Sequence, residues 1–235
     1  MRSRTVTLDG TTLNTLDVFD VSYSHALVEI SDDAMQRVQI ARNVVDRIVE
    51  GDETVYGINT GFGSLVHTQV SHDEVEQLQL NLIRSHATGI GPNLSTEIVR
   101  SMMCVRLNSL VKGHSGCHPD VVSQLQAFLN NRIHPVVPRI GSLGASGDLA
   151  PLSHLACALV GEGPVEYKGQ VMDAMDALRE CELVPLSLRA KDGLSLINGT
   201  SLITGMLAIA VEQLRQLLTS VSYTHLRAHE TQQHL

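Results

Sequence analysis

The chain has 235 residues and a formal net charge of −8, from 17 basic and 25 acidic residues. Hydrophobic residues make up 43% and charged residues 18%, which is ordinary for a folded domain and excludes an intrinsically disordered chain. The acidic balance argues against a nucleic-acid partner and against a polybasic membrane contact.

Neither a membrane span nor a secretory signal is predicted. The most apolar stretch, Leu202 to Val211, is interrupted by Thr204 and Gly205 and is too short to cross a bilayer. The N-terminus lacks the apolar core of a signal peptide. The four cysteines form no CxxC pair, and a chain of this length does not need disulfides for stability. We therefore expect reduced thiols in a cytoplasmic protein that has no membrane partner.

The N-terminal quarter predicts a hairpin, a helix and a loop in that order. Apolar and polar residues alternate around Asp9-Gly10, which predicts a short β-hairpin. Ser31 is a suitable N-cap, and the apolar residues after it recur at three- and four-residue steps up to Gly51, so a helix is predicted there. Residues 54–67 contain three glycines and show no helical period, which predicts a loop.

Helical patterns dominate the rest of the chain. Ser71 and Glu74 have capping-box spacing and open a helix that runs to about Ser85. Residues 134–147 contain two prolines and three glycines and predict a loop or short strands. The remaining predicted helices are at residues 95–112, 119–131, 148–160, 171–180 and 200–218. The pattern favours a mainly α protein with minor β structure near its N-terminus.

Gly144 to Asp148, with the sequence GASGD, is the first candidate for chemistry. The simplest interpretation is a helix N-cap by Ser146 or Asp148. The alternative is backbone cyclisation, in which the Gly147 nitrogen attacks the Ala145 carbonyl carbon and Ser146 loses water, giving a five-membered electrophilic ring. That reaction needs little bulk at Ala145 and free backbone dihedral angles at Gly147. The glycine spacing is not that of a nucleophile elbow.

Other motifs are weaker when taken alone. Tyr56 lies in the glycine-rich segment YGINTGFGS, which lacks a phosphate-binding fingerprint and is either a flexible surface loop or a functional one. His86, near a helix end, and Asn198, in INGT, are most simply packing, capping or turn residues. The segment from His114 to His118 contains metal-ligand residue types but no partner cluster, so we interpret it as structural and predict no metal site.

Together and in this order, the motifs resemble those of the aromatic amino acid ammonia-lyase family, and most nearly its histidine-specific members. The resemblance implies the helical ammonia-lyase fold with a small mixed α/β N-terminal region. It covers about residues 5–218 and is carried by YGINTGFG (56–63), NLIRSHATGIG (81–91), RLNSLVKGHSG (106–116), GSLGASGDLAPLSHLA (141–156), GEG (161–163) and LINGT (196–200).

The resemblance implies a role for each matching residue. Ala145, Ser146 and Gly147 would form the 4-methylidene-imidazol-5-one prosthetic group autocatalytically, without a metal. The helix that begins at Asp148 would direct its positive end toward this electrophile. Tyr56 matches the proposed base for the substrate β-carbon. Because a free tyrosine has a pKa of about 10, its site must lower that pKa or hold the proton transfer tightly.

The substrate side chain and carboxylate also have implied partners. Asn198 matches an asparagine near the ring and the substrate carboxylate. His86, supported by Ser85, matches the position that recognises the substrate side chain. This Ser-His pair is similar to that of histidine lyases and of some tyrosine lyases and aminomutases, since histidine can hydrogen-bond an imidazole or a phenol but not a phenyl ring. The KGHS segment at 112–115 is also similar to some tyrosine-specific members.

The activity implied first is elimination of ammonia from L-histidine, a small amino acid substrate, to give urocanate in cytoplasmic histidine degradation. The full-length protein would be a homotetramer. The alternatives are a tyrosine ammonia-lyase or a tyrosine 2,3-aminomutase. The non-enzymatic alternative is a helical scaffold subunit, although a scaffold needs none of the site residues named above.

The chain departs from the family toward its C-terminus. Family members continue through a long helical C-terminal half that supplies further active-site residues and most of the oligomer interface. Residues 1–219 correspond to the N-terminal part of the lyase domain, with 1–112 as an N-terminal lobe and 113–219 as the start of the central helical region. Residues 220–235 do not match and are more similar to a translated sequencing adapter. We therefore expect a truncated reading frame, an inactive fragment and a poorly ordered tail.

Overall fold

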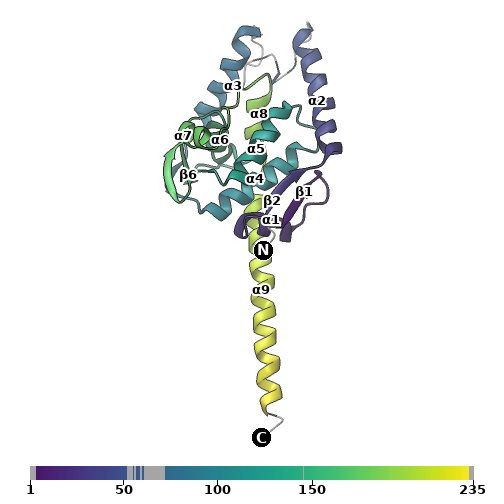
Figure 1. Cartoon of the computed structure of the whole chain (residues 1–235), viewed down its shortest axis with the longest axis vertical. Coiled ribbons are helices and arrows are strands. Elements are labelled where there is room, and N and C mark those ends of the chain that lie inside the picture. Colours follow the sequence, from purple (N-terminus) through teal and green to yellow (C-terminus); the bar gives the residue numbers. More distant parts are fainter. Residues whose placement is uncertain are drawn as a thin grey trace.

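Figure 1 shows the computed structural model of the chain, a mainly helical body from which one long helix projects. The structure describes residues 4–51, 55, 57–58, 60, 72–144 and 146–232. The helices are α1 (Thr15–Tyr23), α2 (Asp32–Glu50), α3 (His72–His86), α4 (Thr96–Leu110), α5 (Pro119–Asn131), α6 (Leu149–Leu159), α7 (Ala174–Glu180), α8 (Asp192–Ile197) and α9 (Ser201–Gln232). The strands are β1 (Thr5–Leu8), β2 (Leu27–Ile30), β3 (Ile90–Asn93), β4 (His134–Pro135), β5 (Pro138–Ile140), β6 (Pro164–Tyr167) and β7 (Gln170–Asp173). The predicted mainly α fold is confirmed.

The N-terminal β structure is a parallel pair, so the predicted hairpin is wrong. β1 pairs with β2 along its whole length, and α1 connects the two strands. The chain does turn after β1, because a carboxylate oxygen of Asp9 accepts hydrogen bonds from the backbone N–H groups of Thr11 (2.7 Å) and Thr12 (2.8 Å). These bonds hold the pKa of Asp9 near 2. The turn leads into a helix because the apolar residues that follow, Val18 and Val21 among them, bury one helical face.

Local signals located most of the other elements correctly. Ser31 accepts a hydrogen bond from the backbone N–H of Ala34 and caps α2, which ends at Gly51. Pro119 occupies the first turn of α5 as predicted. The helix predicted from residue 171 begins only at Ala174, because residues 170–173 form β7 and pair with β6. Residues 134–140 form the short strands β4 and β5.

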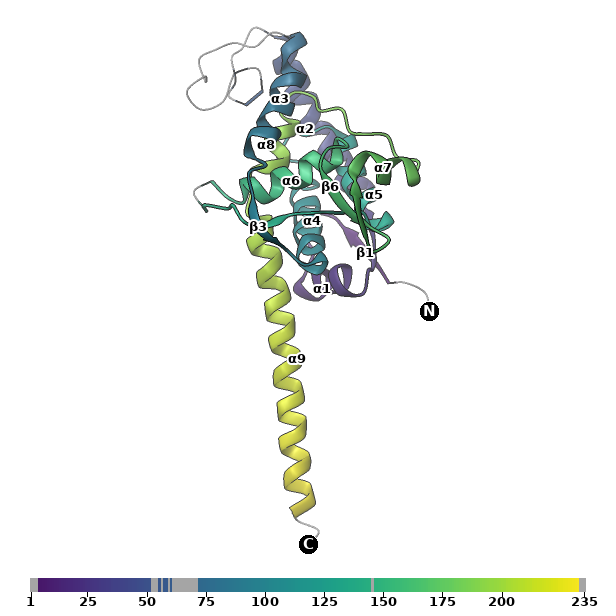
Figure 2. The ribbon, with the colours of Figure 1, turned by 90° about the vertical axis from the view of Figure 1, so that its left-hand side faces the viewer.

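The remaining strands pair in two small antiparallel sheets. β3 pairs with β5, and β4, β6 and β7 form a three-stranded sheet in that order. Helix α4 runs through the middle of the body and packs against α1, α5 and α9 (Figure 2). Its Met102, Met103 and Leu107 are fully buried. All four cysteines are free, as expected from the sequence.

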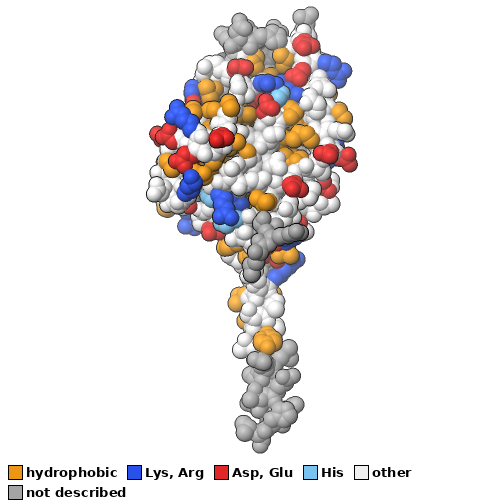
Figure 3. Space-filling view, viewed as in Figure 1, with side chains coloured by type: hydrophobic (Ala, Val, Ile, Leu, Met, Phe, Trp, Pro, Cys, Tyr) orange, Lys and Arg blue, Asp and Glu red, His pale blue; other side chains and the backbone are white. Residues whose placement is uncertain are grey.

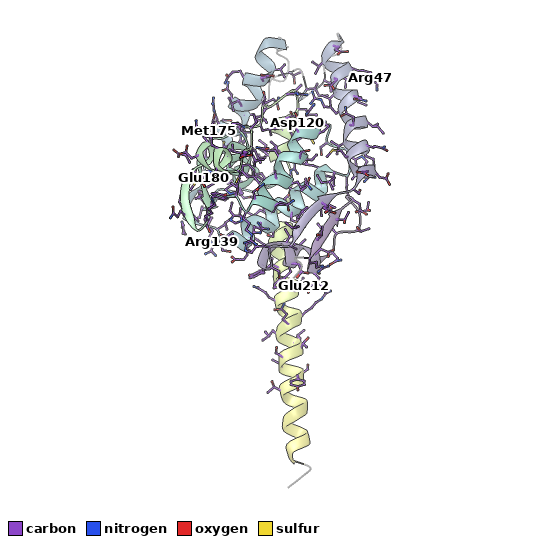
Figure 4. The ribbon with its side chains drawn as sticks, in the orientation of Figure 1. Arg47, Asp120, Arg139, Met175, Glu180 and Glu212 are labelled. Carbon is purple, nitrogen blue, oxygen red and sulfur yellow. The ribbon has the colours of Figure 1, made fainter. Side chains whose placement is uncertain are left out.

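Helix α9 has a buried half and a projecting half. Leu202, Ala208 and Ile209 pack into the body, and Glu212 marks the body's lower edge (Figure 4). Just past that point Gln213 donates to the hydroxyl of Tyr23 at 2.9 Å and Arg215 donates to the hydroxyl of Thr15 at 3.3 Å. The helix then projects from the body and continues to Gln232, well past the predicted end at about residue 218. Backbone hydrogen bonds between successive turns hold this part of α9 in a helix, and these bonds need no tertiary contact.

By length and composition, the segment Asp192–Thr224 could cross a membrane. However, 44% of an apolar stretch of 18 residues within it is buried in the body. The expectation that no segment reaches that length is therefore wrong, because α9 continues past Val211. Five exposed apolar side chains of α9 recur at three- and four-residue steps and so share one face of the helix. We call this face the α9 stripe; it consists of Leu207, Val211, Leu214, Leu218 and Val221. Figure 3 shows hydrophobic side chains along the projecting helix.

Candidate active site

A cavity of about 180 Å³ lies between the C-terminal end of α3 and the N-terminal end of α6. It brings together residues that are sixty positions apart in the sequence. Its lining consists of Ser85, His86, Thr88, Gly141, Ser142, Leu143, Ser146, Gly147, Leu149 and Ala150. Four of the site residues predicted from the sequence are in this set. Tyr56 and Ala145 lie outside the described residues.

Gly147 occupies a position that only glycine can fill. Its φ of +94° lies in the left-handed region, and a Cβ built there would overlap the carbonyl oxygen of Gly199. The next residue, Asp148, donates its backbone N–H to the same oxygen at 2.7 Å. The GASGD turn is therefore pressed against the segment that joins α8 to α9.

Asp148 is fully buried and lies at the N-cap position of α6, as predicted, but its side chain makes no cap hydrogen bond to that helix. Its carboxylate instead accepts hydrogen bonds from the backbone N–H groups of Leu202 (2.9 Å) and Ile203 (3.1 Å) and caps α9. Ser142 donates to its other oxygen at 3.3 Å. The sequence predicted that this side chain caps α6, whereas in the structure it caps α9. The buried Asp148 thus links the N-terminal ends of α6 and α9.

The ring of His86 has a defined hydrogen-bonding direction. Its Nδ1 lies 2.9 Å from the carbonyl oxygen of Leu82 and 3.1 Å from the hydroxyl oxygen of Ser85. A carbonyl oxygen only accepts, so Nδ1 must carry the hydrogen, and in the neutral ring Nε2 is then an acceptor. The Ser85 hydroxyl itself donates to Leu82 O at 2.9 Å. The Ser85 hydroxyl oxygen is thus within hydrogen-bond distance of the His86 ring.

Asn198 lies beside the cavity rather than in its lining. It is the C-cap residue of α8, its side chain is exposed, and its backbone carbonyl accepts a hydrogen bond from Nη2 of Arg106 at 3.0 Å. The following residue, Gly199, makes the contacts with Gly147 and Asp148 described above. The structure therefore brings the Asn198 backbone next to the GASGD turn.

Two residues with structural roles at this site carried no predicted role. The Nε2 atom of His154 accepts a hydrogen bond from the backbone N–H of Gly89 at 3.1 Å and so holds the chain just after His86. Burial lowers the pKa of His154, which keeps the ring neutral and able to accept. Arg106 is the other. Both residues lie in motifs already quoted, but nothing in the local pattern shows what they contact.

Two other features of the described chain, a second cavity and the segment from His114 to His118, lie outside this site. A larger cavity of about 240 Å³ is lined by Glu76, Gln77, Leu80, Val160, Glu162, Leu186, Ser187 and Leu188 and contains none of the predicted site residues. Within the described residues no cluster of three or more His, Cys, Asp or Glu is arranged to hold a metal ion. In the segment from His114 to His118, the ring of His118 accepts from the backbone N–H of Asp120 at 3.2 Å and caps α5, which agrees with a structural role.

Comparison with curated proteins points to histidine ammonia-lyases. Over 200 residues the chain is 53% identical to a protein named histidine ammonia-lyase from Staphylococcus aureus strain JH9. That match covers 85% of this chain and 40% of the relative, so the chain spans about two fifths of the length of the curated relatives it matches.

Solved structures agree on the fold. Histidine ammonia-lyase from Trypanosoma cruzi is 42% identical, with a TM-score of 0.85, over 91% of this chain and 41% of that protein. Tyrosine aminomutase from Streptomyces globisporus is 40% identical, with a TM-score of 0.82, over 86% of this chain and 38% of that protein. The sequence matches the family described as aromatic amino acid lyase over residues 13–231, a range that extends past Thr219. The chain therefore belongs to the aromatic amino acid lyase family.

Proposed function

We propose that this chain is the N-terminal part of an ammonia-lyase that eliminates ammonia from L-histidine to give urocanate, a carbon–nitrogen lyase reaction of histidine degradation. The observation that carries the proposal is that His86, Ser146 and Gly147 line one cavity. The 53% identity to a histidine ammonia-lyase supports the choice of substrate.

Of the three residues that would form the 4-methylidene-imidazol-5-one group, the structure describes Ser146 and Gly147. Ring closure through the Gly147 nitrogen needs little bulk and free backbone dihedral angles at that residue. Gly147 carries no side chain, and its φ of +94° is a conformation that glycine adopts without strain. Ser146 is exposed and lines the cavity, where a substrate can reach it. When formed, the group supplies an electrophilic carbon, which no unmodified side chain of the lining offers.

His86 is proposed to bind the substrate ring. With Nδ1 donating to Leu82, its Nε2 accepts a hydrogen bond, so the site favours a ring that donates one. The imidazole N–H of histidine and the phenol O–H of tyrosine both do, whereas a phenyl ring does not. Tyrosine deamination or a tyrosine 2,3-amino shift is therefore the second candidate, and the 40% identity to a tyrosine aminomutase favours keeping it.

The other roles complete the proposal. Tyr56 removes the proton from the substrate β-carbon, and Asn198 interacts with the substrate carboxylate. We further propose a cytoplasmic enzyme that assembles as a homotetramer, in which the α9 stripe packs on helices outside this chain. A division into 1–112 and 113–219 also remains a prediction, whereas the family match reaches residue 231 and so includes most of the tail that we expected not to match.

The test uses the full-length protein that carries this chain. Formation of urocanate from histidine and of coumarate from tyrosine is followed by ultraviolet absorbance, and kcat/KM is compared. We expect histidine to be the better substrate. A higher kcat/KM for tyrosine would replace the first candidate by the second, and no reaction with either amino acid would favour the scaffold alternative.

A substitution at His86 tests the specificity argument. His86→Phe should lower kcat/KM for histidine roughly 10- to 200-fold and raise that for phenylalanine, because the substrate N–H loses its acceptor. His114→Phe makes the same change at an exposed position outside the cavity and should alter neither value. Equal effects of the two substitutions would contradict the role of His86.

A further inference from the structure

The segment that joins α8 to α9 is held between two layers of the protein. On one side Nη2 of Arg106, from α4, donates to the carbonyl oxygens of Ser195 and of Asn198, the latter at 3.0 Å. On the other side Gly147 and Asp148 contact the carbonyl oxygen of Gly199. The segment therefore contacts the GASGD turn on one face and a buried guanidinium on the other.

The atoms around the Asn198–Gly199 peptide are closely packed. A Cβ on Gly199 would overlap Nη1 of Arg106, and a Cβ on Gly147 would overlap Gly199 O. Atoms packed this closely cannot move one at a time, so a shift of the guanidinium must move the Asn198–Gly199 peptide relative to Gly147. The position of Arg106 thus sets the position of the peptide next to the turn.

Burying the charged side chain of Arg106 costs free energy that an apolar residue filling the same space would not cost. Its side chain is buried, and among the described residues no carboxylate lies within ion-pair distance. Its Nε has no hydrogen-bond partner there. Burial lowers its pKa to about 10, which leaves the group charged at neutral pH. What the charge does contact is backbone carbonyls at the C-terminal end of α8, where a cation is stabilising.

We propose that Arg106 is a positioning residue for the proposed elimination: it fixes the Asn198–Gly199 peptide against Gly147 and so sets where the Asn198 amide meets the substrate carboxylate. The inference rests on the proposed function, because Asn198 has that task only in an amino acid lyase. Arg106 itself acts through the peptide and is not among the residues that line the cavity.

The chain offers a matched control on the same helix. Arg100 is also a buried arginine of α4, and its guanidinium donates to the carbonyl oxygens of Val21 (2.8 Å) and Leu129 (3.0 Å), at the ends of α1 and α5. Arg106→Lys and Arg100→Lys each keep the positive charge but remove the guanidinium, which donates hydrogen bonds to two carbonyl oxygens. They should destabilise the protein comparably, but only Arg106→Lys should disturb the α8–α9 segment.

Two measurements on the full-length protein test the proposal. The first is kcat/KM for histidine per folded molecule: Arg106→Lys should lower it roughly 10- to 100-fold, as a small misplacement of a positioning group does, and Arg100→Lys should change it less than about twofold. The second is hydrogen exchange at the Asp148 amide, whose hydrogen bond to Gly199 O reports the junction directly. It should accelerate in Arg106→Lys and not in Arg100→Lys.

Chemical rescue tests the contribution of the guanidinium group itself. Arg106→Gly leaves space for a free guanidinium ion, and millimolar guanidinium should restore part of the lost kcat/KM, whereas it should not act on Arg100→Gly. Unchanged kcat/KM and Asp148 exchange in Arg106→Lys would overturn the proposal, as would an equal loss in Arg100→Lys. An inactive parent enzyme would instead overturn the proposed function, and the exchange measurement would then decide alone whether Arg106 holds the junction.

Discussion

Replacing three leucines of the α9 stripe, Leu207, Leu214 and Leu218, with glutamine should weaken self-association of the 235-residue chain. These side chains are 62%, 55% and 57% exposed and project from one face of α9. An exposed apolar stripe of this kind on a projecting helix promotes association with another apolar surface. We therefore expect the unmodified chain to form oligomers or aggregates when it is expressed alone.

The size of the effect follows from the exposed area. Burying a whole leucine side chain is worth roughly 1.5–3 kcal/mol, and a little over half of each of these three is exposed. Complete cover by a partner would then contribute about 2.5–5 kcal/mol per chain through these leucines. Since each 1.4 kcal/mol is a factor of ten in Kd, losing this contribution on one chain weakens association roughly 60- to 4,000-fold, and a symmetric dimer of the triple variant loses it on both chains.

Sedimentation velocity over a range of concentrations measures this directly. The control is a triple glutamine variant at Leu143, Val171 and Val184, which are also exposed but lie outside α9. It should associate as the unmodified chain does. A chain that sediments as a monomer at all concentrations, or two triple variants that behave alike, would refute the argument. Because the α8–α9 segment also has the length and composition of a membrane span, flotation with lipid vesicles should be run in parallel, and we expect no binding.

Three further predictions concern chemistry and pH. In the full-length protein, intact mass should show the loss of two waters at residues 145–147, and Ser146→Ala should abolish that loss; an active enzyme of unmodified mass would contradict it. Tyr56→Phe should lower kcat far more than it changes KM, as expected for a group that acts mainly in the transition state, and steady-state kinetics would reveal it. Burial, together with the charge of Arg100, lowers the pKa of His134 from 6.5 to about 3. The unfolded chain therefore binds the proton first, and the free energy of unfolding should fall as the pH drops from about 6.5 toward 3, less steeply in His134→Gln, as urea titrations can measure.

Local sequence signals located the elements well where the cause is local. Capping residues, apolar periodicity and proline placement act within one or two turns, so α2, α4, α5 and α6 lie close to their predicted ranges. The wrong predictions are those for segments whose structure depends on strand pairing with a distant part of the chain. The spacing of apolar residues after β1 suits a hairpin strand and a short helix equally, and the partner that resolves it, β2, lies more than ten residues further along the chain.

The candidate site shows the same division. The order and chemistry of the motifs in the sequence predict His86, Ser146, Gly147 and Asn198 as site residues, and this remains a prediction. The structure adds that Gly147 has a φ of +94°, which favours glycine. Only the folded chain brings His86 to Ser146, because α3 and α6 approach each other through packed side chains that no short motif specifies. Only the folded chain, too, directs the Asp148 carboxylate to α9 and the Arg106 guanidinium to Asn198. Both contacts are long-range hydrogen bonds, whose partners depend on how the helices pack rather than on neighbours in the sequence.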